Sequence, residues 1–258
     1  MVLVAGFDLG SRSVKIALRE GESYAFSSYD TVEFYRRYGR LKEGRLLVDL
    51  RALGLPEGVK IVSTGYGRNT VKIHGGKDIP EIKAHVLGAI AQTGLSDFTL
   101  LDLGGQDTKV ALVRGGRLVD FQTNDRCAAG SGRYLENMAA VLGMKVEELG
   151  EYLEEPVELD ATCAIFGESE LVGRIIEGHP PARLAAGVNY TIWKRVRPML
   201  ENLLSDVVVF TGGVAYNRAV VEIIRRETGV QVVVPAEPRY NGAIGCCVYA
   251  LQTEGERR

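Results

Sequence analysis

One phrase occurs twice in this chain, and it limits the folds that the chain can adopt. The two copies read FDLGSRSVKIALREG and LDLGGQDTKVALVRGG and lie 94 positions apart. The matched residues are Asp8 with Asp102, Leu9 with Leu103, Gly10 with Gly104, and Lys15 with Lys109. In each copy an apolar run ends at Asp-Leu-Gly, and a second apolar run leads into a glycine turn. The repeat predicts two lobes, each begun by a duplicated strand–turn–strand hairpin.

Strand and helix patterns fill the rest of the chain. We expect strands over residues 2–8, 13–19, 22–29, 100–103, 108–113, 118–122, 207–210 and 232–234. We expect helices over residues 80–93, 131–142, 165–177, 182–204, 214–227 and 241–252. Residues 30–50, rich in Tyr and Arg, are predicted to form a solvated hairpin, with a contact surface as the alternative. These patterns predict an α/β fold with a first lobe over residues 1–96 and a larger second lobe over 97–258, whose last helix is free to pack on the first lobe.

Composition and charge exclude several classes of protein. The 258 residues are 46% hydrophobic and 25% charged, with a net charge of −2. This balance lacks the basic character of a nucleic-acid-binding domain. No apolar run approaches the roughly 20 residues of a membrane span, and MVLVAGF fits a first strand better than a signal peptide. Four cysteines without a secretory signal favour a reducing compartment, the cytoplasm, with no nucleic-acid or membrane partner.

Both Asp-Leu-Gly turns have the chemistry of a phosphate-binding loop. Glycine turns expose backbone N–H groups and let them approach an anion closely. Asp8 and Asp102 stand at strand ends, where a carboxylate can hold Mg²⁺ through water. The candidate phosphate contacts are Gly10, Ser11, Arg12, Ser13 and Lys15 in the first turn, and Gly104, Gly105, Thr108 and Lys109 in the second. For either turn taken alone, a purely structural hairpin is the alternative.

Two further residues lie at the tip of the second turn. Gln106 is neutral and can orient an attacking water for ATP hydrolysis, whereas Asp107 can also act as a base. The residue types alone do not choose between them. Together with Asp8 and Asp102 they form the candidate catalytic set.

A third glycine turn supports a nucleotide site. The stretch VVVFTGGVAYNRAV reads as a buried strand, the turn Thr211-Gly212-Gly213, and a helix from Val214 that includes Asn217. Such a turn places helix N-terminal amides against a ligand. The turn Gly130-Ser131-Gly132, before another predicted helix, is a further candidate contact. The chain has neither a P-loop nor a Rossmann fingerprint.

Together these motifs resemble the superfamily of actin, the sugar kinases and the 70-kDa heat-shock ATPases. The resemblance implies a two-lobed actin-like ATPase fold, with duplicated ribonuclease H-like lobes, mixed sheets flanked by helices, and a nucleotide cleft between the lobes. Residues 8–15 and 102–109 correspond to its two phosphate loops, and residues 211–214 with Asn217 to its adenosine loop. RYNGAIGCCVYA corresponds to its closing segment, with Asn241, Gly242 and Ala243 near the nucleotide. ATP or ADP with Mg²⁺ is the implied cofactor.

The four cysteines are of two kinds. Cys246 and Cys247 stand in an apolar helical stretch, where we expect them to be small core residues. Cys127 and Cys163 stand in polar motifs at predicted helix starts, where the helix dipole stabilises a thiolate. A twofold dimer would bring four such thiolates together, which is the ligand set of a [4Fe–4S] cluster. From these residues alone, a zinc site, a disulfide and inert thiols remain open.

Six motifs narrow the resemblance to one family. They are DLGGQDTKV, NDRCAAGSGRYL, TCAIFGESE, STGYGRN, FTGGVAYN and YNGAIGC, and the match runs from Phe7 to Ala250. The chain resembles the ATP-dependent activators of 2-hydroxyacyl-CoA dehydratases and the ATPase subunits of benzoyl-CoA reductase. The resemblance implies a homodimer with one [4Fe–4S] cluster ligated by Cys127 and Cys163 of each subunit. It also implies a donor of the ferredoxin or flavodoxin type and, as electron acceptor, a dehydratase or a related double-cubane cluster protein.

Two stretches depart from the family pattern. Residues 30–50 do not match it, and in EIKAHVLGA the position where the family often has Cys is Ala84. His85 is kept, but a lone histidine on a helix is assigned no role. These departures leave the identity of the electron acceptor open.

Two competing functions share the expected fold. A small-molecule kinase would leave Cys127 and Cys163 unexplained. For a non-redox scaffold or chaperone ATPase we would expect a peptide-binding domain, for which these 258 residues have no room, or actin-like insertions, which the sequence does not show.

Overall fold

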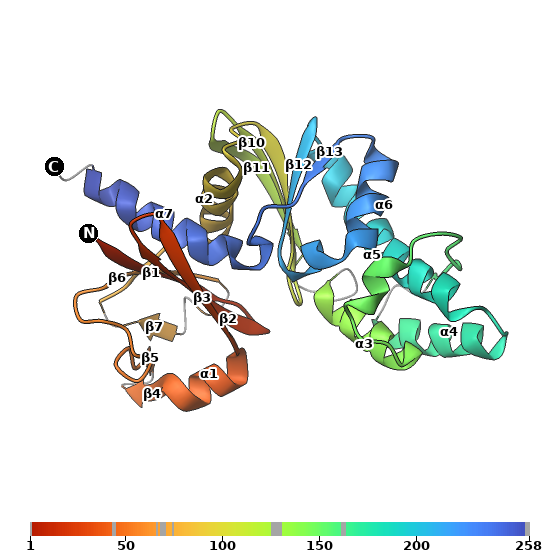
Figure 1. The fold of residues 1–258 in the computed structure, drawn as a ribbon, viewed down its shortest axis with the longest axis horizontal. Coiled ribbons are helices and arrows are strands. Elements are labelled where there is room, and N and C mark those ends of the chain that lie inside the picture. Colours follow the sequence, from red (N-terminus) through yellow and green to blue (C-terminus); the bar gives the residue numbers. More distant parts are fainter. Residues whose placement is uncertain are drawn as a thin grey trace. The chain divides into compact units, whose positions relative to one another are not determined.

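The computed structural model describes residues 2–42, 45–65, 67, 71–73, 75–124, 131–160 and 164–255 (Figure 1). The chain divides into two units. Unit 1 comprises Met1–Leu95 with Arg239–Arg258, and unit 2 comprises Ser96–Pro238. Each unit contains a five-stranded mixed sheet with helices packed on it, which confirms the predicted α/β fold class.

Unit 1 is organised around its first strand. The main sheet holds β1 (Leu3–Leu9), β2 (Ser13–Glu20), β3 (Ser23–Asp30), β6 (Lys60–Thr64) and β8 (Lys77–Asp78) in the order β3-β2-β1-β6-β8. A small sheet holds β4 (Gly39–Lys42), β5 (Arg45–Val48) and β7 (Val71–Ile73). The helices are α1 (Thr31–Tyr38), α2 (Glu81–Thr93) and α7 (Asn241–Gly255), the last preceded by the 3-10 turn η5 (Pro238–Tyr240). β1 is buried from Val4 onward because β2 and β6 flank it on both sides.

Unit 2 repeats this plan with more helices. Its sheet holds β9 (Phe98–Leu103), β10 (Thr108–Arg114), β11 (Arg117–Asn124), β12 (Val207–Thr211) and β13 (Gln231–Val233) in the order β11-β10-β9-β12-β13. Its helices are α3 (Gly132–Leu142), α4 (Ala164–Ile176), α5 (Pro181–Asn202) and α6 (Arg218–Thr228), with 3-10 turns η3 (Glu148–Glu151) and η4 (Gly213–Tyr216). α5 is 22 residues long. Within the described ranges, nevertheless, no helix is both long and apolar enough to span a membrane.

The two sheets share one strand order and one register. In each, the first strand pairs antiparallel with the second and parallel with a strand that arrives after a crossover. A buried aspartate lies opposite a lysine on one neighbour and a threonine on the other: Asp8 opposite Lys15 and Thr64, and Asp102 opposite Lys109 and Thr211. The duplicated phrase therefore forms the same antiparallel pair of strands in each unit, as the repeat in the sequence predicts.

Residues 30–50 contain a helix that the sequence patterns did not reveal. The Asp30 carboxylate caps α1 and accepts hydrogen bonds from two backbone N–H groups of its first turn, at 2.9 and 3.2 Å. Phe34 and Tyr38 form the buried face of α1. The predicted hairpin exists, but only afterwards, as β4 and β5. The prediction was wrong for the helix because one short apolar face is hidden among tyrosines and arginines.

The helix predicted over residues 214–227 consists of two segments. η4 ends at Tyr216, and α6 begins at Arg218. Between them Asn217 has an extended backbone (φ −78°, ψ 101°), and its Oδ1 accepts from the backbone N–H of Val220 at 3.0 Å. Asn217 is thus the N-cap of α6, and this cap separates the two segments.

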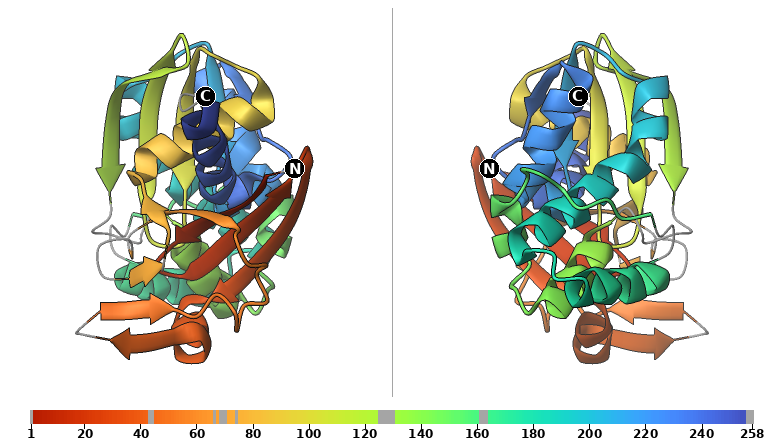
Figure 2. Two further views of the ribbon diagram at one scale, coloured as in Figure 1. Left: turned by 90° about the vertical axis from the view of Figure 1, so that its left-hand side faces the viewer. Right: turned by 90° about the vertical axis from the view of Figure 1, so that its right-hand side faces the viewer.

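Helices α2 and α7 lie side by side in unit 1 with their backbones in contact (Figure 2). Three glycines allow this approach. A Cβ on Gly245 would lie 2.6 Å from the carbonyl carbon of Ala84, and one on Gly88 would lie 2.9 Å from a carbonyl carbon at the start of α7. A Cβ on Gly6 of β1 would lie 3.0 Å from the carbonyl carbon of Ala243. The absence of side chains at these positions therefore sets how closely α2, α7 and β1 pack.

Cys246 and Cys247 are core residues, as predicted from their apolar surroundings. Both are completely buried on α7. The thiol of Cys247 donates to the backbone carbonyl of Ala17 at 3.3 Å. Burial raises the pKa of Cys247 to about 12, so this thiol is protonated and unreactive at neutral pH.

The glycine contact between α2 and α7 makes a testable prediction. Gly245→Ala should destabilise unit 1, because the new Cβ would overlap backbone that has no rotamer to escape into. Overpacking of this kind costs about 1–3 kcal/mol or more. Gly173→Ala on α4 is a matched control, because nothing lies within 4 Å of its added Cβ. The control should gain roughly 0.5–1 kcal/mol from helix propensity.

Urea denaturation of the two variants and the wild type measures both effects. A Gly245→Ala protein at least as stable as the wild type would show that α2 and α7 do not pack with this spacing.

Candidate functional site

Asp8 and Lys15 form a nearly buried ion pair in unit 1. Asp8 is the penultimate residue of β1 and is only 3% exposed. Lys15 Nζ lies 3.0 Å from its Oδ2. The antiparallel register places the two residues directly opposite each other. Because a buried carboxylate without a cation is costly, Lys15 is held beside the turn that follows the strand.

Unit 2 repeats this pair with further contacts. Asp102 is 2% exposed, and its Oδ1 accepts from the hydroxyl of Thr211 at 2.7 Å. Its Oδ2 lies 3.7 Å from Lys109 Nζ. Lys109 Nζ also contacts the carboxylate of Asp107 at the tip of the turn, next to the half-buried Gln106. One lysine therefore links Asp102 at the strand end to Asp107, one of the two candidate water-orienting residues.

The first turn is attached to α1. The hydroxyl of Thr31 donates to the backbone carbonyl of Gly10 at 2.8 Å. Arg12 forms an ion pair of 3.0 Å with Asp30, the N-cap of α1. The predicted contacts Ser11 and Ser13 are exposed and half-buried, respectively. Arg12 thus helps to hold the turn against α1, in addition to any contact with an anion.

The second turn is attached to the start of α3. The backbone N–H groups of Gly132 and Arg133 donate to the carbonyls of Gly104 and Gly105, both at 2.9 Å. The hydroxyl of Ser131 also donates to the Gly105 carbonyl at 2.9 Å. Ser131 is completely buried, so its hydroxyl holds the turn from behind. Gly130, predicted in the same motif, lies outside the described residues.

The Thr211-Gly212-Gly213 turn has two different glycines. Gly212 has φ +87°, and a Cβ there would lie 2.6 Å from the carbonyl carbon of Leu103, so the backbone itself requires glycine. A Cβ on Gly213 would have nothing within 4 Å. The open space beside Gly213 is where a ligand can approach the backbone. Val214, which follows, is buried.

Asn217 is fully engaged within unit 2. Its Oδ1 caps α6, and its Nδ2 donates to Oδ1 of Asn189 at 2.9 Å. Asn189 Nδ2 in turn donates to the backbone carbonyls of Leu149 and Tyr152, at 2.6 and 2.7 Å. This buried amide pair positions the turn after β12 relative to α5 and η3.

The predicted closing segment lies beside Asp8 in unit 1. Asn241 and Ala243 are completely buried at the start of α7. A Cβ on Gly242 would lie 3.4 Å from Cγ of Asp8. Within unit 1 the structure therefore brings together the first turn and the closing segment. Within unit 2 it brings together the second turn, the start of α3 and the turn after β12.

Three residues near the first turn were missed from the sequence. Thr64 and Gly65 end β6 as Thr211 and Gly212 end β12: Gly65 has φ +100°, and a Cβ there would lie 2.7 Å from the carbonyl oxygen of Leu9. The dipeptide Thr64-Gly65 can be seen in the sequence. It does not lie 94 positions from Thr211-Gly212, however, so the repeat does not pair the two. Tyr35 of the unpredicted α1 is the third. Burial, together with the charge of Asp8, raises its pKa to about 12, so the phenol remains protonated.

The structure describes two of the four predicted metal ligands, Asp8 and Asp102. Cys127 and Cys163 lie outside the described residues. Among the residues that are described, no three His, Cys, Asp or Glu side chains are grouped to hold a metal ion directly. Asp8 and Asp102 are single carboxylates, each beside a lysine. Such a donor set fits Mg²⁺ held through its water shell, because Mg²⁺ usually keeps several waters.

These features are those of a known ATPase family. Residues 5–250 match the BadF/BadG/BcrA/BcrD ATPase family. The chain belongs to that family. The resemblance inferred from the six motifs is confirmed, and the matched range includes both Asp-Leu-Gly turns and the turn Thr211-Gly212-Gly213.

Known proteins are similar to this chain over about three quarters of its length or more. A 2-hydroxyisocaproyl-CoA dehydratase activator from Clostridioides difficile is 34% identical over 263 residues, 97% of this chain and 96% of that protein. The (R)-2-hydroxyglutaryl-CoA dehydratase activating ATPase of Acidaminococcus fermentans is 37% identical over 196 residues, 74% of this chain and 75% of that protein. The solved structure of the Clostridium difficile activator, with bound ADPNP, superimposes with a TM-score of 0.84 at 30% identity, covering 99% and 97% of the two chains. The actin-like ATPase fold is thereby confirmed.

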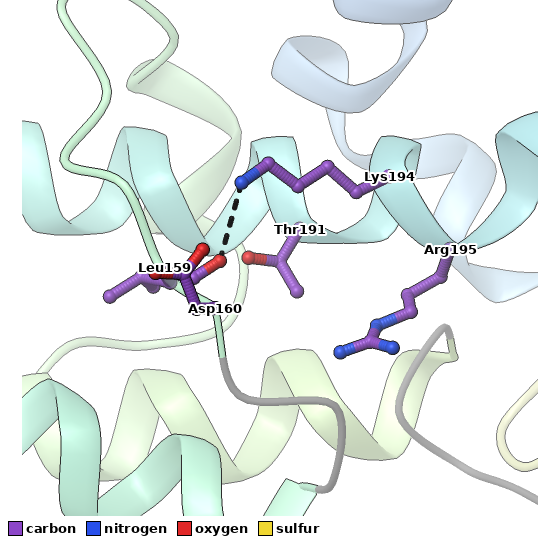
Figure 3. A pocket seen from close by; sticks show the side chains of 5 residues that line it. All are labelled: Leu159, Asp160, Thr191, Lys194 and Arg195. Carbon is purple, nitrogen blue, oxygen red and sulfur yellow. Dashed lines mark hydrogen bonds between the residues drawn. The ribbon is translucent and has the colours of Figure 1, made fainter.

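Unit 2 also contains a small pocket that none of the predicted site residues lines. It encloses about 150 Å³ between Leu159, Asp160, Thr191, Lys194 and Arg195 (Figure 3). Lys194 Nζ donates to the backbone carbonyl of Leu159 at 3.4 Å across it (Figure 3). Pockets that bind small molecules usually enclose about 300–1,000 Å³, so this one is too small for a nucleotide. We assign it no ligand.

The contrast between Gly212 and Gly213 leads to a testable prediction about ATP binding. Gly213→Ala should keep the fold, because the added methyl meets open space, but should lower ATP affinity at least about tenfold if adenosine lies against this backbone. Calorimetric titration with ATP measures the affinity, and thermal unfolding measures the fold. Gly173→Ala, equally open but on α4, is the control and should bind ATP normally. A folded Gly213→Ala protein with unchanged affinity would remove this turn from the nucleotide site.

Proposed function

We propose that the chain is an ATP-dependent iron–sulfur activator that delivers low-potential electrons to a 2-hydroxyacyl-CoA dehydratase or a related double-cubane cluster protein. The observation that carries the proposal is the recurrence of a buried Asp–Lys pair and a glycine turn at equivalent places in two units. Full-length similarity to a dehydratase activator supports the partner class. The proposed electron donor is a ferredoxin or a flavodoxin.

In the proposed ATP complex, the first and second turns bind the phosphates. Lys15 and Lys109 neutralise phosphate charge from strand positions that the register already sets. Asp8 and Asp102 hold Mg²⁺ through its waters. Bound Mg²⁺ would neutralise the charge that develops on the phosphates during hydrolysis. The adenosine contacts are the turn at Gly213 and the closing segment.

We assign the orientation of the attacking water to Gln106. Asp107 lies next to it, but its carboxylate is engaged by Lys109. A carboxylate held in an ion pair is poorly available as a base, whereas the neutral amide of Gln106 can both donate to and accept from a water. Asp107 then serves to hold Lys109 at the tip of the second turn.

The attachment of the second turn to α3 supports coupling between ATP and the cysteine motif. Three hydrogen bonds join Gly104 and Gly105 to residues 131–133 at the start of α3. Ser131, which makes one of them, follows Cys127 by four positions in the sequence. Phosphate contacts that move the second turn are therefore transmitted to the chain that carries Cys127. The hydrolysis state of the nucleotide thereby reaches the redox site.

We propose that Cys127 and Cys163 of two protomers ligate one [4Fe–4S] cluster in a homodimer. The two cysteines of one chain supply half of the four thiolates that such a cluster takes. When bound, the cluster supplies one-electron transfer at low potential. Cys246 and Cys247 are not available for this role, because both thiols are buried in the core of unit 1.

Asp102→Asn tests the ATPase assignment. The amide keeps the shape of the side chain and an oxygen for the Thr211 hydroxyl, but it removes the charge beside Mg²⁺. We expect ATP hydrolysis to fall by about 10²–10³-fold. The exposed Asp206→Asn is the matched control and should hydrolyse ATP at the wild-type rate. Phosphate release assays with thermal unfolding decide: equal rates for both folded variants would refute the role of the second turn.

Cysteine variants test the cluster. Cys127→Ser and Cys163→Ser should each remove two of four ligands per dimer, so that iron content and visible absorption are lost while ATP binding persists. Cys246→Ala should keep its iron, because this thiol lies in the core. Iron and sulfide analysis of anaerobically reconstituted protein, with sedimentation for mass, should give about four iron atoms per two chains. Retention of iron by the Cys127 and Cys163 variants would contradict the cluster assignment and favour the kinase alternative.

A further inference from the structure

Arg133 lies at the start of α3 beside the second turn, and the sequence assigned it no role. Its backbone N–H donates to the carbonyl of Gly105 at 2.9 Å, and its side chain is exposed. A Cβ on the preceding residue, Gly132, would lie 3.6 Å from Cα of Gly105 and 3.6 Å from Cγ2 of Val214. The start of α3 therefore contacts both the second turn and the turn after β12.

The first backbone amides of α3 already have acceptors. The N–H groups of Gly132 and Arg133 donate to the second turn, and those of Tyr134 and Leu135 donate to the carbonyl of Ser131 at 3.1 and 3.4 Å. A helix N-terminus binds an anion through amides that lack such acceptors. The backbone of α3 is therefore not the part that meets a phosphate. Because Tyr134 and Leu135 are buried, the exposed side chain in this first turn that can meet one is that of Arg133.

An arginine at this position is opposed by the helix dipole. The positive end of a helix disfavours a cation and favours an acid. Helices α1 and α2 follow this rule with Glu33 and Glu81 in their first turns, whereas α3 has no acid there and has Arg133 instead. Other arginines pair with a carboxylate, as Arg174 does with Glu177 at 3.1 Å. Arg133 has no such partner among the described residues, so a bound anion would relieve its position.

The second turn lacks positive charge without Arg133. Lys109 Nζ lies 3.7 Å from the carboxylate of Asp102 and also contacts that of Asp107. Two carboxylates thus surround one ammonium group, and the three side chains together are net negative. Such a turn repels a phosphate until a cation is added. Arg133 brings the balance to neutral before any Mg²⁺ contributes its own charge.

We propose that Arg133 is a further phosphate-binding residue of the ATP site, acting from α3 on the phosphates at the second turn. Side chains of a helix tilt toward its N-terminus, so the side chain of Arg133 extends toward the end of α3 that contacts the turn. Its guanidinium presents a planar fork of N–H donors that matches two phosphate oxygens. The inference rests on the proposed ATPase function and deepens it, because it names the cation that balances the second turn.

The test compares Arg133→Gln with Arg117→Gln in the full chain. Arg133→Gln removes the charge but keeps a long polar side chain of similar helix propensity. Arg117 is an exposed arginine of the same unit, opposite Arg114 at the end of the β10–β11 hairpin away from the second turn, and is the matched control. Arg133→Lys keeps the charge without the fork. Calorimetry measures the affinities for ATP with Mg²⁺ and for adenosine, thermal unfolding measures stability, and iron analysis measures the cluster.

We expect Arg133→Gln to bind ATP about tenfold to a hundredfold more weakly, the loss of hydrogen bonds to a charged group. The affinity for adenosine, which has no phosphate, should stay that of the wild type, and Arg133→Lys should recover part of the ATP affinity. The melting temperature of Arg133→Gln should not fall, because the exchange removes a cation from the positive end of a helix. Its ATP affinity should also depend less steeply on salt concentration than that of the wild type.

Three results overturn the inference. The first is a folded Arg133→Gln protein with the ATP affinity of the wild type and of Arg117→Gln, whether or not its iron is lost. The second is an equal loss of ATP and adenosine affinity, because the effect then does not come from the phosphates. The third is an unchanged ATP affinity in Arg133→Ala, the exchange best suited to a helix, which replaces Arg133→Gln if that variant does not fold. A wild-type chain that binds no ATP instead refutes the proposed function.

Discussion

A buried aspartate at the end of a strand needs a cation beside it, and this requirement organises both units. Asp8 and Asp102 are each nearly inaccessible, and each has a lysine directly opposite on the next strand. The lysine meets the aspartate only in this register, because a slip of one residue turns every side chain of the strand to the other face. The ion pair therefore stabilises the hairpin and concentrates charge at the turn that follows it. A turn with exposed N–H groups and a fixed lysine beside it is well suited to a phosphate.

Around each ion pair, glycine brings backbone against backbone. Gly65 and Gly212 have positive φ and end equivalent strands against the carbonyls of Leu9 and Leu103. Contacts of this kind leave N–H groups, rather than bulky side chains, at the strand ends, which suits the close approach of a nucleotide. The features that stabilise each sheet thus also shape the turn at the end of its strand. Within the turn after β12, an added Cβ meets backbone at Gly212 and open space at Gly213, so we expect only the first substitution to lower stability directly.

The two units use one sheet but attach different parts to it. In unit 1 the first turn is held by α1 through Thr31, and the closing segment packs beside Asp8. In unit 2 the second turn is bonded to the start of α3, four positions after Cys127. The duplication therefore explains why the two sheets and their turns are alike, whereas the two turns differ in the elements to which they are bonded.

The sequence by itself determined the local elements of this protein. Periodic apolar residues and glycine turns act over a few positions, so they predicted the duplicated sheet with its two Asp-Leu-Gly turns and the buried Cys246 and Cys247. It did not reveal α1, whose buried face is only Phe34 and Tyr38, because so short an amphipathic pattern resembles a hairpin. Nor did it show that His85 lies against Asn241 at the start of α7.

Only the tertiary structure decided which partners the polar side chains have. Asn217 has the position of a ligand contact in its motif, yet its amide bonds to Asn189, 28 positions earlier in the chain. Asn241 bonds to His85 across 156 positions, and it does so because glycines let α2 and α7 meet. A hydrogen bond depends on distance in space, and the spacing of residues along the chain carries no information about contacts between elements this far apart. The two Asp-Leu-Gly turns could therefore be predicted from the sequence, whereas the side chains that hold them could not.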